Sequence, residues 1–333
     1  MFLNGLLLTL GFVALTAQAG PDRKLYQKIW PSIVRVYAVM DQGGIATGSG
    51  VVVASDKIIS NCHVTRDARA IDVVAWNSKW KVKEQVKDID HDLCLLIVSR
   101  DIGKAIEFGD PAAIAVGQQV VAAGYPGGGR LEVTDGQIRG LHNQDGGRII
   151  QSSAPFDSGE SGGGLFDRDG KLLGIITFKS PAGGAFFFAV PANWVQKLMQ
   201  ARAMEFEGAK KTEAFWERLP NDQPPFMRAI AREAVDDWNG LFLYASQWIK
   251  DDAGNPEPWV ALGKSLYRLN RYSDAIAPLK KAIELESSHS QGWFYLARTY
   301  RDMGDKNSLA AALEKLSALD PVAAQSLRAD SPQ

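Results

Sequence analysis

The sequence of 333 residues is poor in cysteine and histidine and almost free of net charge. It contains two cysteines and four histidines, and its formal net charge is −1. Lysine and arginine form no cluster along it, so nothing favours a nucleic acid as a partner. Two cysteines permit one disulfide, and four histidines leave few candidates for a general base. The length suggests about two domains.

Long apolar runs are also scarce, and the clearest one lies at the N-terminus. Residues 6–15 are apolar but interrupted, which is too short for a membrane span. Ala17-Gln18-Ala19 then supplies the small-x-small pattern of a signal-peptide cleavage site. No lysine or arginine precedes the run, which is atypical of a signal peptide. We predict a signal peptide over residues 1–19 and a periplasmic or secreted protein without a stable membrane span.

The middle of the chain has the pattern of strands. Turn residues separate short apolar runs at residues 51–53, 58–59, 71–74, 93–98, 120–123, 172–178 and 185–190. No long segment of helical period intervenes, and residues 193–202 have the first such pattern. We therefore predict an all-β domain with Greek-key-like strand order over residues 20–200, closed by a helix.

The C-terminal part has a helical period and an internal repeat. The prolines at 224 and 225 break the chain. Trp259-Val-Ala-Leu-Gly then recurs 34 residues later as Trp293-Phe-Tyr-Leu-Ala, which resembles tetratricopeptide repeats. We predict a linker over 201–224, about three repeats over 225–322 with the first degenerate, and a tail over 323–333. An ordinary amphipathic helical hairpin is the alternative.

Residues 159–163, Gly-Glu-Ser-Gly-Gly, fit two motifs for a nucleophilic serine. An α/β-hydrolase elbow would place its acid and histidine after the serine, but only His289 follows Ser161. A trypsin-like protease has the order His, Asp, Ser. His63 ends a predicted strand-turn-strand segment and Asp92 begins an apolar strand, so this order is present. A glycine-rich turn without chemistry is the third interpretation.

Residues 25–199 as a whole resemble trypsin-like serine proteases, most closely the exported HtrA/Deg branch. The matching stretches are residues 28–34, 49–64, 91–96, 124–126, 133–138, 151–154 and 188–193. The resemblance implies two six-stranded β-barrels, with a catalytic site between them that hydrolyses peptide bonds through an acyl-enzyme. The sequence departs from the branch in three ways: no PDZ-type domain follows, the early loops are short, and Gly164 stands where relatives carry proline.

The resemblance assigns roles to four residues. Ser161 is the nucleophile, His63 the general base and Asp92 the acid that orients it. The N–H groups of Gly159 and Ser161 form the oxyanion hole. His91 is expected to point away from the cleft, because neighbours on a strand face opposite ways. His142 is expected in a surface loop.

The two cysteines, Cys62 and Cys94, flank the proposed base and acid. Because the fold brings Asp92 to His63, a disulfide between the cysteines is one hypothesis, and two buried thiols are the other. A zinc site that also uses His63 and His91 is disfavoured, because no C-x-x-C or H-x-x-x-H spacing is present. We expect no metal and no cofactor.

The expected substrate is a protein or a peptide. Residues 154–156 and 185–188 should line the specificity pocket, which has no aspartate at its floor; small or medium apolar residues are therefore favoured over lysine or arginine. We predict an exported serine endopeptidase of protein quality control whose helical repeats recruit substrate or a protein partner, or restrain the cleft. The alternative is a catalytically silent pseudoprotease that serves as a peptide- or protein-binding scaffold.

Overall fold

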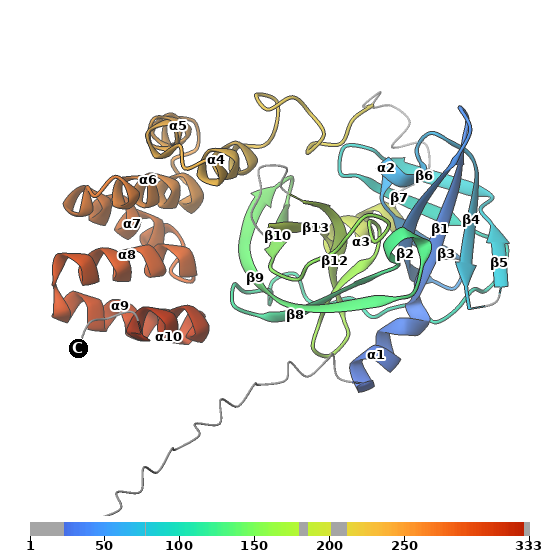
Figure 1. The fold of residues 1–333 in the computed structure, drawn as a ribbon, viewed down its shortest axis with the longest axis horizontal. Helices are drawn as coiled ribbons and strands as arrows, with labels where there is room; N and C mark the ends of the chain where they lie inside the picture. Colours follow the sequence, from blue (N-terminus) through green and yellow to red (C-terminus); the bar gives the residue numbers. More distant parts are fainter. Residues whose placement is uncertain (1–22, 77, 180–185, 201–211, 330–333) are drawn as a thin grey trace, which may run out of the picture.

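The computed structural model describes residues 23–76, 78–179, 186–200 and 212–329. The predicted signal peptide lies outside these residues. They form a β-rich region followed by a region of helices, which lie side by side in Figure 1. Within the described ranges, no helix combines the length and the apolar character needed to cross a membrane.

The first half of the β-rich region is an antiparallel sheet of seven strands in the order β5-β4-β1-β2-β3-β7-β6. Helix α1 (Arg23–Ile29) and the 3₁₀ turn η1 (Trp30–Ser32) precede it, and the short helix α2 (Cys62–Thr65) follows β3. The strands are β1 (Ile33–Met40), β2 (Ile45–Ala54), β3 (Lys57–Ser60), β4 (Ala68–Ala75), β5 (Ser78–Lys81), β6 (Glu84–Asp88) and β7 (Leu93–Ile97).

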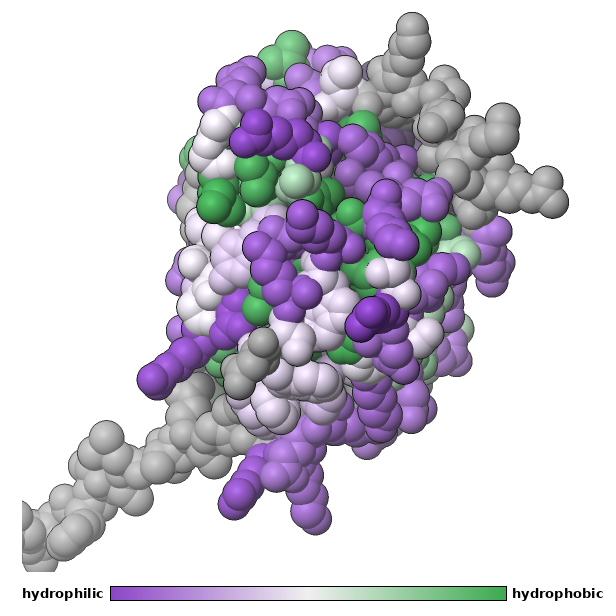
Figure 2. All heavy atoms as spheres, turned by 90° about the vertical axis from the view of Figure 1, so that its right-hand side faces the viewer, coloured by the Kyte–Doolittle hydropathy of each residue, from purple (hydrophilic) through white to green (hydrophobic). Residues whose placement is uncertain are grey.

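This sheet contains the strands of the six-stranded barrel that the resemblance implied, with one of them divided into β5 and β6. The edge strands β5 and β6 belong to one chain segment that breaks at Val82 and Lys83. The Val82 N–H donates to Ile71 O at 2.9 Å and the Lys83 N–H to Ile97 O at 2.8 Å, so the segment pairs with both ends of the sheet. The sheet therefore curls back on itself. Figure 2 shows this side of the molecule, where hydrophilic side chains predominate.

The second half is a closed six-stranded barrel in the order β10-β13-β12-β11-β8-β9. The strands β8 and β12 are almost wholly buried, as their continuous apolar sequences predict. Their side chains share one hydrophobic core with β2, β3 and β7 of the sheet. The elements are β8 (Gln119–Gly124), the 3₁₀ turn η2 (Pro126–Gly128), β9 (Glu132–Gln144), β10 (Gly147–Ser152), β11 (Gly164–Asp167), β12 (Leu172–Lys179), β13 (Phe187–Pro191) and α3 (Ala192–Gln200).

The helical region consists of successive helices that pack on one another. Gly263 lets α6 approach α7 closely, because a Cβ there would lie 2.4 Å from the Leu279 Cγ. Ala275 and Ala282 are fully buried on α7. The helices are α4 (Pro225–Ala234), α5 (Trp238–Asp251), α6 (Pro256–Arg268), α7 (Tyr272–Leu285), α8 (Ser290–Met303), α9 (Lys306–Leu319) and α10 (Pro321–Ala329).

One predicted boundary is wrong, and one predicted segment has contacts that were not expected. The expected tail from residue 323 is helical, because α10 begins at Pro321 and buries Ala324 and Leu327 in the same core as α9. The expected linker also packs on the rest of the protein. Residues 212–224 lie against the β-rich region, where Phe215 is only 1% exposed.

The helices contact the barrel at β9, and this contact corrects the expectation for His142. Its side chain is buried rather than on a surface loop, with Nδ1 2.9 Å from Glu257 Oε2 on α6 and Nε2 3.0 Å from Gln151 Oε1. Its ring also stacks on Phe226 of α4 at 4.5 Å between centroids. Burial alone would lower the pKa of His142, but Glu257 raises it above its usual value.

Candidate active site

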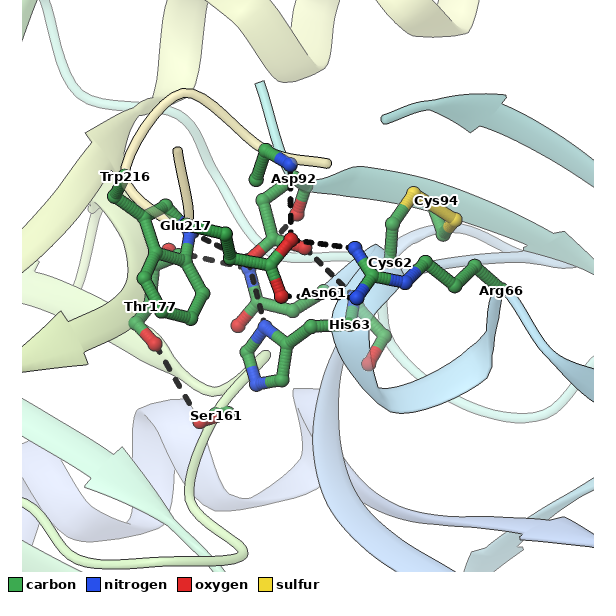
Figure 3. Close-up of polar contacts among 12 residues, drawn as sticks. Asn61, Cys62, His63, Arg66, Asp92, Cys94, Ser161, Thr177, Trp216 and Glu217 are labelled. Atoms are coloured by element: carbon green, nitrogen blue, oxygen red, sulfur yellow. Dashed lines mark hydrogen bonds and ion pairs between the residues drawn. A yellow bond between two sulfur atoms is a disulfide. The ribbon is translucent and has the colours of Figure 1, made fainter. Parts of the chain in front are cut away.

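His63 and Asp92 form a closely paired unit in the first half of the site. The Nδ1 of His63 lies 2.6 Å from Asp92 Oδ2, and the His63 N–H donates to Asp92 Oδ1 at 2.8 Å. Figure 3 shows the imidazole directed toward Ser161. The Asp92 side chain is 0% exposed. A buried carboxylate that receives these donors fixes both the orientation and the tautomer of the imidazole.

The backbone of Asp92 is held as firmly as its side chain. The residue lies in a turn just before β7 rather than on the strand, with a φ of 57°. Its carbonyl oxygen accepts from Asn61 Nδ2 at 2.9 Å and from the Cys62 N–H at 3.2 Å. Aspartate tolerates this left-handed conformation better than most residues do. The turn therefore aims the carboxylate at α2, which carries His63.

Cys62 and Cys94 form a disulfide, with their Cα atoms 4.9 Å apart. The bond joins the residue before His63 to the strand that follows Asp92. It therefore crosslinks the two segments that carry the pair, as Figure 3 shows. Bonded sulfurs offer no thiolate to a metal ion, so the zinc interpretation does not fit this geometry.

Ser161 lies in a loop that two glycines shape. Gly159 has a φ of +94° and Gly162 a φ of +88°. A Cβ on Gly159 would lie 2.4 Å from Gly127 N, and one on Gly162 would lie 2.2 Å from Ser49 O. Both the backbone conformation and the close approach therefore require glycine. The Ser161 carbonyl oxygen accepts from the Ser49 N–H at 2.8 Å, which ties the loop to β2.

The Ser161 side chain is held less firmly than its backbone. Its Oγ donates to Thr177 O at 3.5 Å, and within the described ranges no hydrogen bond joins it to His63. In the same part of the chain, the N–H groups of Gly159 and Ser161 donate to no protein acceptor. The two groups are therefore available to a substrate oxygen.

Glu160 lies beside Ser161 but is buried in the loop, with 1% of its surface exposed. Its Oε2 accepts from the Asp157 N–H at 2.5 Å. Burial, reinforced by the nearby carboxylates of Glu132 and Asp157, raises its pKa to about 7. No role was predicted for this position, because the serine motif leaves it variable.

Trp216 and Glu217, in the segment of residues 212–224, lie beside the pair, and neither was predicted from the sequence. Trp216 Nε1 donates to Asp92 Oδ2 at 3.0 Å. Glu217 accepts two hydrogen bonds from Arg66 at 2.5 and 2.9 Å. Burial would raise the pKa of Glu217, but Arg66 lowers it below its usual value. The available signal was the adjacent aromatic pair Phe215-Trp216, which is unusual for an exposed linker.

The remaining candidates lie away from Ser161 or partly outside the described residues. His91 Nδ1 is 2.7 Å from Asp88 Oδ2, and its ring packs on Trp194 at 4.0 Å, so it points away from the cleft as predicted. In the expected specificity pocket, Ala154 and Phe156 are buried, and Phe156 contacts Phe187 at 5.4 Å between centroids. Residue 185 of that pocket lies outside the described residues.

Comparisons with known proteins agree with this arrangement. Residues 48–175 match the model of the trypsin-like peptidase domain. Periplasmic serine endoprotease DegP of Escherichia coli is 33% identical over 181 residues, covering 51% of this chain and 38% of the relative. Serine protease Do-like HtrB of Bacillus subtilis is 31% identical over 170 residues, covering 45% of this chain and 37% of the relative.

A solved structure, described as HtrA-type protease AlgW with tripeptide, is 28% identical, covers 53% of this chain and 61% of its own, and has a TM-score of 0.49. The chain spans about two fifths of the length of the two curated relatives, 38% and 37%. By sequence, the β-rich region is therefore similar to trypsin-like serine endopeptidases of the HtrA type. This similarity does not favour the scaffold alternative.

Proposed function

We propose that the protein is a serine endopeptidase in which Ser161, His63 and Asp92 form the catalytic triad. The observation that carries the proposal is the His63–Asp92 pair, whose carboxylate is buried and whose imidazole is directed toward a serine near two glycines of positive φ. A structural serine in a turn would not need a histidine held by a fully buried carboxylate. The similarity to trypsin-like peptidases supports the same assignment.

In the proposed mechanism, Ser161 Oγ turns from Thr177 O toward His63 Nε2 when a peptide binds. Hydrogen bonds of this kind are often long without substrate and shorten in the substrate complex. His63 takes the serine proton as Oγ attacks the carbonyl carbon, and Asp92 stabilises the imidazolium that forms. The N–H groups of Gly159 and Ser161 stabilise the oxyanion. His63 then protonates the leaving amine, and water hydrolyses the acyl-enzyme.

We further propose that the protease domain is exported after cleavage behind Ala19 and that residues from 225 onward form tetratricopeptide-like repeats. The 34-residue recurrence and the close approach of α6 to α7 at Gly263 support the repeats. The first helices of successive pairs, α4 and α6, contact the barrel through Phe226 and Glu257. The repeats therefore stand where they can restrain the barrel as well as recruit a protein partner.

The test is to map cleavage in a broad mixture of denatured peptides by mass spectrometry. The protein would comprise residues 20–333, with Ser161→Ala as the matched control. Cleavage that occurs only with Ser161 is the expected result, with small or medium apolar residues before the cut. Absence of cleavage with either protein would contradict the proposal and favour the scaffold alternative. Dominant cleavage after lysine or arginine would overturn the proposed specificity alone.

A further inference from the structure

The Asp92 carboxylate receives a hydrogen bond from a residue far along the chain. Trp216 Nε1 lies 3.0 Å from Asp92 Oδ2, the same oxygen that lies 2.6 Å from His63 Nδ1. The indole also meets the imidazole edge to face, with 5.4 Å between ring centroids and 87° between planes. Trp216 therefore touches both members of the proposed acid–base pair, as Figure 3 shows.

Several contacts hold Trp216 in this place. The preceding residue, Phe215, is 1% exposed, and its N–H donates to Asp90 O at 3.0 Å, two residues before Asp92. The Trp216 ring itself stacks on Phe178 of β12, at 5.4 Å and 8° between planes. The indole is thus packed between the half of the site that carries His63 and the half that carries Ser161.

An ion pair fixes the same segment to the helix of the proposed base. Glu217 follows Trp216 and binds Arg66, which directly follows α2. Arg218 forms a second ion pair, with Asp90. Arg66 lies three residues after His63 and Asp90 lies two residues before Asp92, so both ion pairs hold the segment close to the pair.

A buried carboxylate is stable in its ionised form only when its oxygens are satisfied by donors. The Asp92 carboxylate faces three donors: the backbone N–H of His63, the His63 imidazole and the Trp216 indole N–H. The indole N–H and the imidazole both bind Asp92 Oδ2. The indole therefore affects the strength and the direction of the hydrogen bond between that oxygen and His63.

We infer that Trp216 is a positioning residue for the His63–Asp92 pair, supplied by residues 214–218 outside the matched peptidase domain. The inference rests on the proposed function, since it assigns Trp216 a role in that reaction. It also extends the catalytic unit to Arg218, beyond the predicted end of the domain at residue 200 and the end of the family match at residue 175.

The test uses residues 20–333 with Trp216→Phe, which keeps the stacked ring but removes the N–H. Trp259→Phe is the matched control, because Trp259 on α6 also donates its indole N–H at 3.0 Å, in this case to the Ala253 carbonyl oxygen rather than to a carboxylate. Loss of a hydrogen bond to a charged group predicts a fall in kcat of about 10- to 100-fold with little change in KM. The control should keep wild-type kcat. Glu217→Gln weakens one anchor and should lower kcat less, in the same direction.

A spectroscopic measurement separates positioning from a merely structural role. The proton shared by His63 and Asp92 gives a far-downfield proton NMR resonance, and Trp216→Phe should shift it while Trp259→Phe leaves it in place. Unchanged kcat, or a fall in kcat without a shift, would overturn the inference. If the wild-type protein and Ser161→Ala are equally inactive, the proposed function fails. The NMR measurement then decides the role of Trp216 alone: a shift of the resonance in Trp216→Phe supports it, and an unchanged resonance overturns it.

Discussion

The two halves of the candidate site are built in different ways. In the first half, a disulfide, the Asn61 side chain and the Trp216 indole hold His63 and Asp92 from several directions. In the second half, only the backbone of Ser161 is fixed, and its Oγ is turned to Thr177 O. The His63–Asp92 pair is therefore already assembled, whereas Ser161 Oγ would have to rotate to act as the proposed nucleophile.

The largest effect should come from Asp92→Asn, which disrupts the His63–Asp92 pair. An amide cannot accept from the imidazole and the backbone as the carboxylate does, so the wrong tautomer is favoured and kcat should fall on the order of 10⁴-fold. Steady-state kinetics on a mapped peptide measures this. His91→Asn is the control, since His91 points away, and it should retain nearly full activity. An Asp92→Asn variant with a tenth of wild-type kcat would refute the role of Asp92.

The next largest effect should come from Gly159→Ala, which changes the loop that carries Ser161. The new Cβ would meet Gly127 N at 2.4 Å in a left-handed backbone, so the loop must shift and the oxyanion hole with it. We expect kcat to fall about 10²- to 10³-fold. Gly43→Ala is the matched control, because Gly43 has a φ of +93° but no atom within 4 Å of its Cβ position. Equal activity of the two variants would contradict an oxyanion hole at Gly159.

The contribution of the disulfide to stability can be measured by replacing Cys62 and Cys94 together with alanine. The disulfide closes a sequence separation of 32 residues. Its loss should lower the free energy of unfolding by about 3 kcal/mol, chiefly because the unfolded chain gains freedom. Urea denaturation with and without a reducing agent measures the change. If the reducing agent has no effect on the wild-type protein, the two thiols are not bonded in solution.

The smallest effect is a pH-dependent change in stability, absent at low pH, that involves Glu160 in the loop of Ser161. Because the folded pKa of Glu160 is raised to about 7, from 4.5, the wild-type protein should lose stability as pH rises through this range. Glu160→Gln removes the titration, so it should be more stable than wild type at pH 8, by about 3 kcal/mol, and similar at low pH. Thermal unfolding across pH measures this, with the exposed Glu84→Gln as control. Parallel pH profiles for all three proteins would rule out a buried Glu160.

Sequence alone predicted the parts of the site that local pattern determines. His63 follows a strand, Asp92 precedes an apolar strand and Ser161 stands among glycines, so each position is marked by its own neighbours. Trp216 was missed because its partner is 124 residues away and its surroundings resemble a linker. His142 was misplaced for the same reason, since its burial depends on Glu257 of a distant helix.

The fold was predicted to a similar extent. The apolar runs at β8 and β12 marked these strands, and the tryptophan-leucine-glycine pattern marked α6. Strand β9 carries mostly polar residues and two glycines, so its pattern does not predict a strand; pairing with β8 and β10 determines its structure. The bend of the β5–β6 segment was missed because it depends on hydrogen bonds to both β4 and β7.

The contact of Trp216 with Asp92 also sets an order of events during synthesis. The partners of Asp92 Oδ2 lie 29 residues before it and 124 residues after it in the chain. A ribosome that works from the N-terminus delivers His63, Asp92 and Ser161 before the indole. Contacts between distant residues also form late, because closing a long loop costs entropy. The three proposed catalytic side chains therefore precede Trp216 in the chain, and the contact of the indole with Asp92 is expected to form after the His63–Asp92 pair.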